Sequence, residues 1–384
     1  LLQDKAAAVC VMDIYNGDIV SLVSSPTFQP NAFVHGLDKK YWNSLITDGK
    51  KPLTNKAMSG LYPPGSTIKT LVALSALENG IIKPQDTFRC KGKIELHGEK
   101  FHCWEKKGHG IVNLRKGIQR SCDVYFYEIA RKLGVDRLSE TAKKFGLGKP
   151  VLSDFSEERS GVVPNTKWKK KFIGQNWYIG ETLHTGIGQG YFLSTPIQLC
   201  LMTAQIANGG YEIKPRIVFD KEKNDLENYL DFILKNPDET IDTDKLIKKF
   251  NLKPLFKNQE NINIVKDAMY SSSNEPGGTS YRHRMENPKF TFAGKTGSSQ
   301  IKRFTEAQRE AEVKQKDLNY KDRDHALFIA FAPYKNPKYA ISVVVEHGGS
   351  GGSEAAPIAQ KVIKKVLERD DLRQKVSFSQ GEPI

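Results

Sequence analysis

Apolar side chains near the start of the chain fall in two short runs that predict β-strands. Residues 6–13 and 18–24 are apolar and rich in β-branched side chains. Between them Asn16 and Gly17 form one of the strongest short signals for a hairpin turn. The pattern therefore predicts an antiparallel pair of strands.

The end of the chain repeats this pattern and adds a helix. Residues 326–333 and 338–346 predict a second hairpin, and residues 355–369 carry apolar side chains at helical spacing. We expect strands from both ends to share one antiparallel sheet, backed by the terminal helix.

The middle of the chain has the apolar spacing of helices, each followed by a glycine that favours helix termination. These helices are expected at 67–79, 114–133, 136–145 and 196–208, before Gly80, Gly134, Gly146 and Gly209. Two segments are strongly charged. Residues 220–252 indicate a surface insertion, and residues 302–324 indicate either a mobile flap beside a site or a solvated loop.

Composition narrows the class of protein only moderately. The chain has 384 residues, 39% of them hydrophobic, which is typical of a globular protein. Its net charge of +14 is compatible with an anionic partner, but the lysines are scattered and no nucleic-acid-binding or P-loop motif accompanies them. We therefore interpret the charge as a solvated basic surface and expect no nucleic acid partner.

Ser66 stands where a helix is expected to begin. Pro63 and Pro64 cannot continue an upstream helix and Gly65 permits a tight turn. Ser66 then lies at the helix N-terminus, where free N–H groups and the helix dipole favour negative charge. Lys69 follows one turn later on the same face, and burial of this apolar helix disfavours a charged amine. Lys69 is therefore a candidate base for a nucleophilic Ser66.

A second element follows an apolar run near the end of the chain. Lys295-Thr296-Gly297 predicts a strand end along which a substrate backbone can lie. Lys295 supplies a cation, and the hydroxyls of Thr296 and Ser298 can hold a carboxylate. The backbone N–H groups of Ser298 and Ser66 form a candidate oxyanion hole. The alternative is a lysine–threonine pair at a sheet edge beside a glycine bulge.

A third element, Ser121 and Asp123, lies in a segment expected to be helical. Such a hydroxyl can relay a proton, while the polar group two residues on orients a lysine. Each pattern is weak alone, because Ser299 with Lys302 also matches the first element and 272–274 matches this one. Ser66 could equally be a helix cap beside an unrelated lysine. The occurrence of all three elements in this order is far more specific.

With these elements the chain resembles the penicillin-binding transpeptidases, and among them the class B, elongation-type members typified by penicillin-binding protein 2. The resemblance spans nearly the whole chain, and it includes the motifs at 63–67, 157–161, 186–198, 276–279 and 323–334. It implies an α+β fold like that of serine β-lactamases, with a five-stranded antiparallel sheet flanked by helices plus a mostly helical lobe. The expected lobes are α/β at about 1–60 and 262–375, and helical at about 61–261.

The resemblance implies a serine D-Ala–D-Ala transpeptidase that β-lactams inhibit covalently. Ser66 would attack a stem peptide with Lys69 as general base, and a neighbouring amine would then resolve the acyl-enzyme. Ser121 would relay a proton and Asp123 would position it. Lys295, Thr296 and Ser298 would hold the terminal carboxylate of the donor, and Gly297 would also belong to the substrate-binding site.

Asp123 departs from the wider family, which usually has Asn at this position. A carboxylate beside two lysines keeps them charged longer and therefore opposes a neutral Lys69. Elongation-type members resemble this chain in having Asp, so we interpret Asp123 as a trait of the subgroup.

A cluster of cysteine and histidine predicts a metal site. The candidate ligands are Cys90, Cys103, His109 and Cys122. Three thiolates and an imidazole suit tetrahedral zinc, although the spacing is not that of a standard finger. A disulfide or buried thiols are alternatives, and His97 or His102 could replace a ligand. Some elongation-type relatives carry a structural zinc in this region, so the resemblance favours zinc, which would brace the Ser121–Asp123 element. We expect no organic cofactor.

The resemblance also implies a location and partners. The chain has no initiator Met, no signal peptide and no apolar run near 18 residues, so we expect a fragment without its membrane anchor and non-catalytic pedestal. The native protein would be held at the bacterial inner membrane with this domain in the periplasm. The expected partners are stem peptides, β-lactams, a lipid-II-polymerising glycosyltransferase and rod-shape scaffold proteins.

Two alternatives for the function remain open on the sequence. A β-lactamase or D,D-carboxypeptidase of the same fold would transfer the acyl group to water. A penicillin-sensing domain would bind covalently without turnover.

Overall fold

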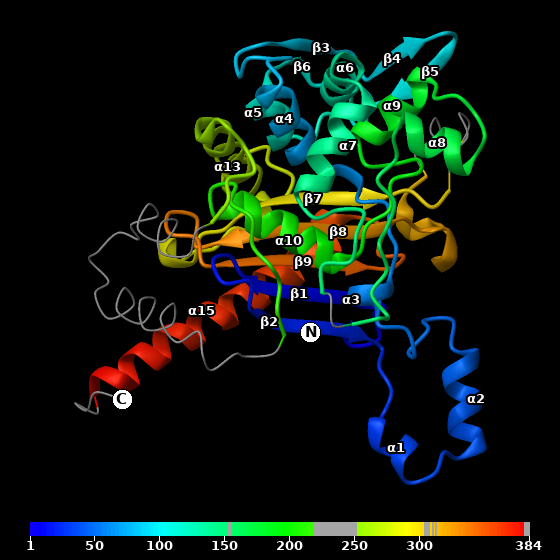
Figure 1. Ribbon diagram of the computed structural model, residues 1–384, viewed down its shortest axis with the longest axis vertical. Coiled ribbons are helices and arrows are strands. Elements are labelled where there is room, and N and C mark those ends of the chain that lie inside the picture. Colours follow the sequence, from blue (N-terminus) through cyan, green and yellow to red (C-terminus); the bar gives the residue numbers. More distant parts are fainter. Residues whose placement is uncertain (153–154, 218–251, 303–307, 309–310, 312, 380–384) are drawn as a thin grey trace.

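The central sheet is built from both ends of the chain. The computed structural model describes residues 1–152, 155–217, 252–302, 308, 311 and 313–379. Five antiparallel strands lie in the order β2-β1-β9-β8-β7, so the N-terminal hairpin pairs with the C-terminal one (Figure 1). They are β1 (Ala7–Asp13), β2 (Ile19–Ser25), β7 (Ala293–Ser299), β8 (His325–Ala332) and β9 (Tyr339–Val345). Both predicted hairpins and the shared sheet are confirmed.

Alternate residues of the central strands pack into two separate hydrophobic layers. In β8, Leu327 and Ile329 belong to the layer under the helical lobe, whereas Phe328 and Ala330 belong to the layer on the opposite face. A strand covered on both faces needs apolar side chains at every position, because successive residues point to opposite sides. This explains why the strand sequences are nearly continuous apolar runs.

A helix covers each face of the sheet. α10 (Pro196–Ala207) packs on β1 and β9, and every one of its residues is buried. α15 (Ala356–Ser379) covers the other face, where Ile358, Ile363 and Leu367 join the apolar side chains of the strands. The predicted C-terminal helix is therefore confirmed, and so is its apolar face.

A mostly helical lobe lies above the sheet in Figure 1. Its helices are α4 (Lys69–Glu78), α5 (Leu114–Gln119), α6 (Asp123–Leu133), α7 (Val135–Lys144), α8 (Thr166–Phe172) and α9 (Ile179–Gly186). α13 (Gln259–Asn274) packs against α5 and β7. Two small sheets pair β3 (Phe88–Cys90) with β6 (Gly110–Val112) and β4 (Lys93–Leu96) with β5 (Glu99–His102). The α+β fold is confirmed; the exact lobe boundaries stay a prediction.

Short helices complete the described chain. α1 (Pro30–Val34) and α2 (Lys39–Thr47) project away from the sheet at the lower right of Figure 1, and α3 (Lys56–Ser59) returns the chain to it. The remaining turns are η1 (Gly65–Ile68), η3 (Tyr281–His283), η4 (Pro288–Phe290), η5 (Gln315–Asp317), η6 (Tyr320–Asp322) and η7 (Gly351–Ala355). Across the described residues, no helix combines the length and the apolar character needed to cross a bilayer.

The single helix expected at 114–133 is wrong. The segment divides into α5 and α6, and Ser121 between them adopts a left-handed backbone with φ of 53°. Cys122 is extended and precedes the first residue of α6, so Asp123 lies in that helix's first turn. The pair predicted within a helix therefore stands at a helix break, where its side chains can reach a neighbouring element.

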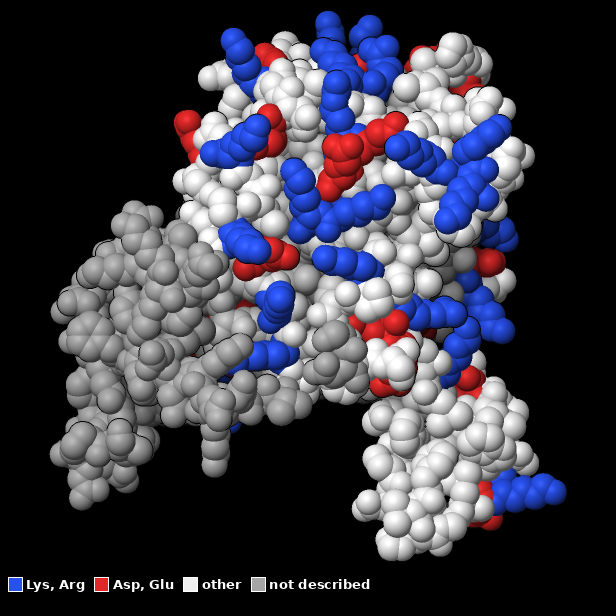
Figure 2. All heavy atoms as spheres, viewed as in Figure 1, with Lys and Arg blue, Asp and Glu red and all other residues white. Residues whose placement is uncertain are grey.

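The charged segments and the basic surface are only partly visible in the structure. In Figure 2 Lys and Arg are spread over the visible face with acidic side chains among them, and they form no continuous stripe. Almost all of 220–252 lies outside the described residues. Of the segment 302–324, residues 302, 308, 311 and 313–324 are described, and the last of these ranges contains η5 and η6.

Candidate active site

Ser66 lies at the junction between the helical lobe and the sheet. It is in η1, which leads directly into α4, as the Pro-Pro-Gly sequence predicts. Gly65 has φ of 53°, and a Cβ there would lie 2.5 Å from the carbonyl oxygen of Ser298. Only glycine allows this approach, so Gly65 lets the Ser66 turn lie directly against β7.

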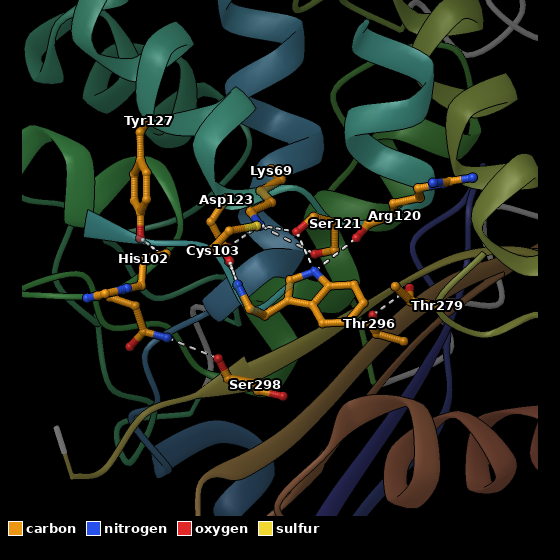
Figure 3. Close-up of polar contacts among 12 residues, drawn as sticks. Lys69, His102, Cys103, Arg120, Ser121, Asp123, Tyr127, Thr279, Thr296 and Ser298 are labelled. Carbon is orange, nitrogen blue, oxygen red and sulfur yellow. Dashed lines mark hydrogen bonds and ion pairs between the residues drawn. The ribbon is translucent and has the colours of Figure 1, made fainter. Parts of the chain in front are cut away.

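Lys69 is fully buried one turn after Ser66. Its Nζ donates to Oδ1 of Asp123 at 2.6 Å, to the carbonyl of Ser121 at 2.9 Å and, more weakly, to the Ser121 hydroxyl at 3.4 Å (Figure 3). In the described structure its hydrogen bonds go to these two residues and not to Ser66 Oγ. Catalytic contacts often tighten only when substrate binds, so this geometry keeps Lys69 as a candidate base.

Ser121 connects the two lysines. Nζ of Lys295 donates to the Ser121 hydroxyl at 2.8 Å and to the carbonyl of Thr296 at 2.9 Å. Ser121 therefore lies between Lys295 on the sheet and Lys69 on α4. A hydroxyl in this position can accept a proton from one neighbour while it donates one to the other.

Burial sets the protonation of this network. It lowers the pKa of Lys295 well below its usual value, and nearby Lys69 acts in the same direction while Asp123 opposes both. Burial also raises the pKa of Asp123, an effect that Lys69 counteracts. Because two lysines share a dry site with one carboxylate, Asp123 can compensate the charge of only one of them, and burial favours a neutral amine at the other.

The Lys295 motif lies within a strand, not at its end. The structure corrects the expected strand end, because Lys295, Thr296, Gly297 and Ser298 all belong to β7, which pairs only with β8 in the described sheet. β7 is thus an edge strand, and an edge strand offers free backbone groups to an added peptide strand. The apolar run before the motif misled the prediction, since the strand starts only at Ala293.

Hydroxyl and amide side chains that the sequence did not single out support the β7 motif. The Thr296 hydroxyl bonds that of Thr279 at 2.8 Å, and the amide of Gln189 donates to the carbonyl of Ser298 at 3.0 Å (Figure 3). Both residues lie in segments that resemble the family, at 186–198 and 276–279, which was the available signal. Their contacts come from distant parts of the chain, so spacing alone gave no indication of them.

Residues of all three elements line one cleft of about 1400 Å³, whereas Lys69 and Lys295 are fully buried and bond to Ser121 in its wall. Its walls include the Ser66 turn, the Ser121 break, β7 and the loop after β9, together with β5 and the two residues after it. Its lining includes Ser66, Trp104, Ser121, Asp123, Thr296, Ser298 and Gly351. The structure therefore brings the three predicted elements to one cavity.

The rival motif matches lie in other environments. Ser299 is fully buried in β7, while Lys302 is exposed and pairs with Asp322. On α13, Ser272 contacts Thr279 at 3.2 Å and so supports the hydroxyl that reaches Thr296. Neither of these two matches contributes a residue to the lining of the cleft.

The four predicted metal ligands converge beside this cleft. Cys90, Cys103, His109 and Cys122 place one ligand atom each within 4.8 Å of all the others, and neither His97 nor His102 belongs to this group. Nδ1 of His109 lies 3.5 Å from Sγ of Cys103 and 3.8 Å from Sγ of Cys90. A tetrahedral zinc with Zn–S bonds of about 2.3 Å separates its ligands by about 3.6 Å, so the geometry fits.

The chemistry of the thiols agrees with a cation site. All five cysteines of the chain are free, which excludes a disulfide in this structure. A hydrogen bond from Cys122 lowers the pKa of Cys103 to about 3, while the same contact and burial raise the pKa of Cys122. Burial also raises the pKa of Cys90. These shifts favour the thiolate at Cys103, and a bound cation would stabilise all three thiolates.

The cluster adjoins the catalytic candidates directly. Cys122 immediately precedes Asp123, and Cys103 precedes Trp104, whose backbone N–H donates to Oδ2 of Asp123 at 2.9 Å. Two of the four candidate ligands, Cys103 and Cys122, are therefore the sequence neighbours of Trp104 and Asp123, which form this hydrogen bond.

Comparison with known proteins agrees with this geometry. The family model of the penicillin binding protein transpeptidase domain matches residues 7–364. The chain belongs to this family. The similarity to the penicillin-binding transpeptidases predicted from the three motifs is thus confirmed.

Individual members place the chain near penicillin-binding protein 2. It is 36% identical over 371 residues to the peptidoglycan D,D-transpeptidase MrdA of Salmonella typhimurium, covering 96% of this chain and 56% of that protein. The structure resembles penicillin-binding protein 2 from Helicobacter pylori in complex with MreC, with a TM-score of 0.80 and 34% identity over 96% of this chain and 61% of that one. It also resembles Pseudomonas aeruginosa PBP2 in complex with WCK 5153, with a TM-score of 0.78 and 33% identity over 95% and 74% of the two chains. The chain thus spans little more than half the length of the curated relative.

Proposed function

We propose that this chain is a serine D,D-transpeptidase domain that cross-links peptidoglycan stem peptides through an acyl-enzyme on Ser66. One observation carries the proposal: a hydrogen-bonded network of Lys69, Ser121, Asp123 and Lys295 meets Ser66 in a cleft with an open edge strand. Membership of the transpeptidase family supports it, as does the activity named for the Salmonella relative.

Acylation starts when the Ser66 oxygen forms a bond to the carbonyl carbon of the penultimate D-Ala. Lys69 removes the hydroxyl proton, assisted by Ser121, and the terminal D-Ala leaves after its nitrogen receives a proton from the same network. Asp123 holds Lys69 through the 2.6 Å contact. The backbone N–H groups of Ser66 and Ser298 would stabilise the oxyanion. The amine of a second stem peptide then attacks the ester and regenerates Ser66.

The β7 strand would orient the donor peptide. Its backbone would add to the free edge at Gly297, while Lys295, Thr296 and Ser298 hold the terminal carboxylate. The Thr279 hydroxyl fixes that of Thr296. A β-lactam presents a similar carboxylate and carbonyl, so it would acylate Ser66.

We also propose that Cys90, Cys103, His109 and Cys122 hold a structural zinc. The compact donor set supports this assignment. When bound, zinc would supply a fixed tetrahedral centre and keep the thiolates deprotonated. Cys103 and Cys122 would then hold the loops that carry Trp104 and Asp123.

The location and partners of the whole protein follow the same relatives. We propose a bacterial inner-membrane protein with this domain in the periplasm, working with a lipid-II-polymerising glycosyltransferase and rod-shape scaffold proteins. The H. pylori relative was found in complex with MreC, which supports a scaffold partner.

Time-resolved labelling with a fluorescent penicillin tests the proposal. We expect stable labelling of the wild type and none of Ser66→Ala, with Ser44→Ala, an exposed serine on α2, as the control that labels normally. Rapid loss of the label would favour a β-lactamase or carboxypeptidase instead. Stable labelling without D-Ala release from a stem-peptide mimic would favour a sensor. Normal labelling of Ser66→Ala would contradict the proposed nucleophile.

A further inference from the structure

The carbonyl of Ser121 is held from two sides at a strained position. Ser121 has φ of 53°, which a residue with a side chain adopts at a cost and keeps only where its surroundings enforce it. Nζ of Lys69 donates to this carbonyl at 2.9 Å from α4, and the indole Nε1 of Trp104 donates at 3.1 Å from the loop after β5. The indole also donates to the carbonyl of Arg120 at 3.0 Å. The side chain of Trp104 therefore donates hydrogen bonds to two carbonyls, those of Arg120 and Ser121, in the turn between α5 and α6.

Trp104 holds Asp123 as well, through its main chain. Its backbone N–H donates to Oδ2 of Asp123 at 2.9 Å, which leaves Oδ1 for Lys69. One residue thus contacts both members of the Ser121–Asp123 element with two separate donors. Hydrophobic packing does not account for its position, because 57% of Trp104 is exposed and it lines the cleft.

We propose that Trp104 is a positioning residue for acylation, whose indole N–H keeps the Ser121 hydroxyl between Lys69 and Lys295. This inference rests on the proposed function. Without the indole donor, the Ser121 backbone loses one of the contacts that oppose relaxation toward an ordinary φ. The hydroxyl then moves away from the lysines, and the proton transfers during acylation slow down. Binding of the donor carboxylate at Thr296 and Ser298 does not depend on this contact.

The test replaces Trp104 by Phe, which removes the indole N–H and keeps an aromatic ring and the backbone N–H. Acylation by a fluorescent penicillin is measured over a range of concentrations, which separates the limiting rate constant from the half-saturating concentration. Loss of one hydrogen bond predicts a limiting rate constant roughly fivefold lower, with an unchanged half-saturating concentration. Trp42→Phe, the same change on α2, is the matched control and should match the wild type.

Two checks keep the result specific to positioning. Metal content and melting temperature of Trp104→Phe should equal those of the wild type, since the ring is mostly exposed and both Cys103 and His109 remain. A wild-type limiting rate, a defect confined to the half-saturating concentration, or a defect accompanied by metal loss would each overturn the inference. If the wild type is acylated at Ser66 and any of these three results is observed, the positioning role of Trp104 is contradicted but the proposed function is not. If the wild type is not acylated at all, the proposed function fails with it.

Discussion

Two buried lysine–carboxylate pairs in this chain show what separates a structural ion pair from a reactive one. Lys169 on α8 pairs with Glu181 on α9 and lies 4.6 Å from the centre of the Tyr178 ring. Lys69 pairs with Asp123 at 2.6 Å and is equally buried. The two lysines are therefore similar in burial and in partner.

The two pairs differ in the groups that surround the lysine and the carboxylate. In the described structure, aromatic rings and a backbone N–H surround the Lys169 pair, and its lysine donates a hydrogen bond to Glu181 alone. The Lys69 pair adds a hydroxyl and a second buried lysine, Lys295, whose pKa burial lowers, and it adjoins a cleft. A buried ion pair becomes chemically useful when a further titratable group can exchange protons with it.

The largest expected contrast comes from removing each lysine. Lys69→Met should lower acylation by a fluorescent penicillin by roughly 100- to 10,000-fold, because it removes the proposed general base. Lys169→Met should leave the acylation rate within about twofold and lower the free energy of unfolding by about 2–3 kcal/mol, since Glu181 keeps some solvent contact. The measurements are acylation kinetics and denaturant unfolding of both variants. Comparable acylation losses in the two would remove the distinction.

An intermediate effect is expected from the carboxylates. Asp123→Asn removes the charge that supports protonated Lys295, so the pKa of Lys295 should fall further. If neutral Lys295 takes part in the proton transfers, the acidic limb of the pH–rate profile should move to lower pH. The maximal rate should drop about tenfold, because Lys69 loses its orienting contact. Glu181→Gln is the control, and a shift of the acidic limb to higher pH in Asp123→Asn would contradict this sign.

The smallest effect is expected from metal removal. Only the Lys69 pair adjoins the cysteine cluster, through Cys122 and the backbone N–H of Trp104. A verified metal-free sample should therefore acylate several-fold more slowly, roughly in line with the loss of one or two positioning contacts. The Lys169 region should keep its amide hydrogen-exchange rates. Unchanged acylation in the metal-free protein would refute the bracing role of the cluster.

Short sequence signals were sufficient to predict those hairpins and helix ends that depend on neighbouring residues. Apolar runs with Asn16-Gly17 between them located the first hairpin, and the glycines after the helices, such as Gly134 with φ of 80°, lie where the chain must turn. The three motifs named the residues that meet in the cleft because chemistry restricts the residue types there. Their roles stay a prediction until they are tested.

The features that the sequence did not predict depend on contacts between separate segments of the chain. No glycine or proline marks the break at Ser121, because its left-handed backbone depends on donors from Lys69 and Trp104. The strands β3 and β6 have only three residues each, too few to show an alternating pattern, so their pairing beside Cys90 and His109 was not predicted. Hydrogen bonds and strand pairs of this kind join separate segments of the chain, so helical or strand periodicity does not predict them.

The pairing of β1 with β9 has a consequence for the order in which the strands of the sheet can come together during synthesis. Ala7 pairs with Val345, so β1 lacks a neighbour on that side until β9 has been synthesised. β7, which carries Lys295, likewise joins the sheet only through β8. A nascent chain that ends before β7 therefore holds Ser66 and Lys69 without Lys295 and without the strand that would present a substrate to them.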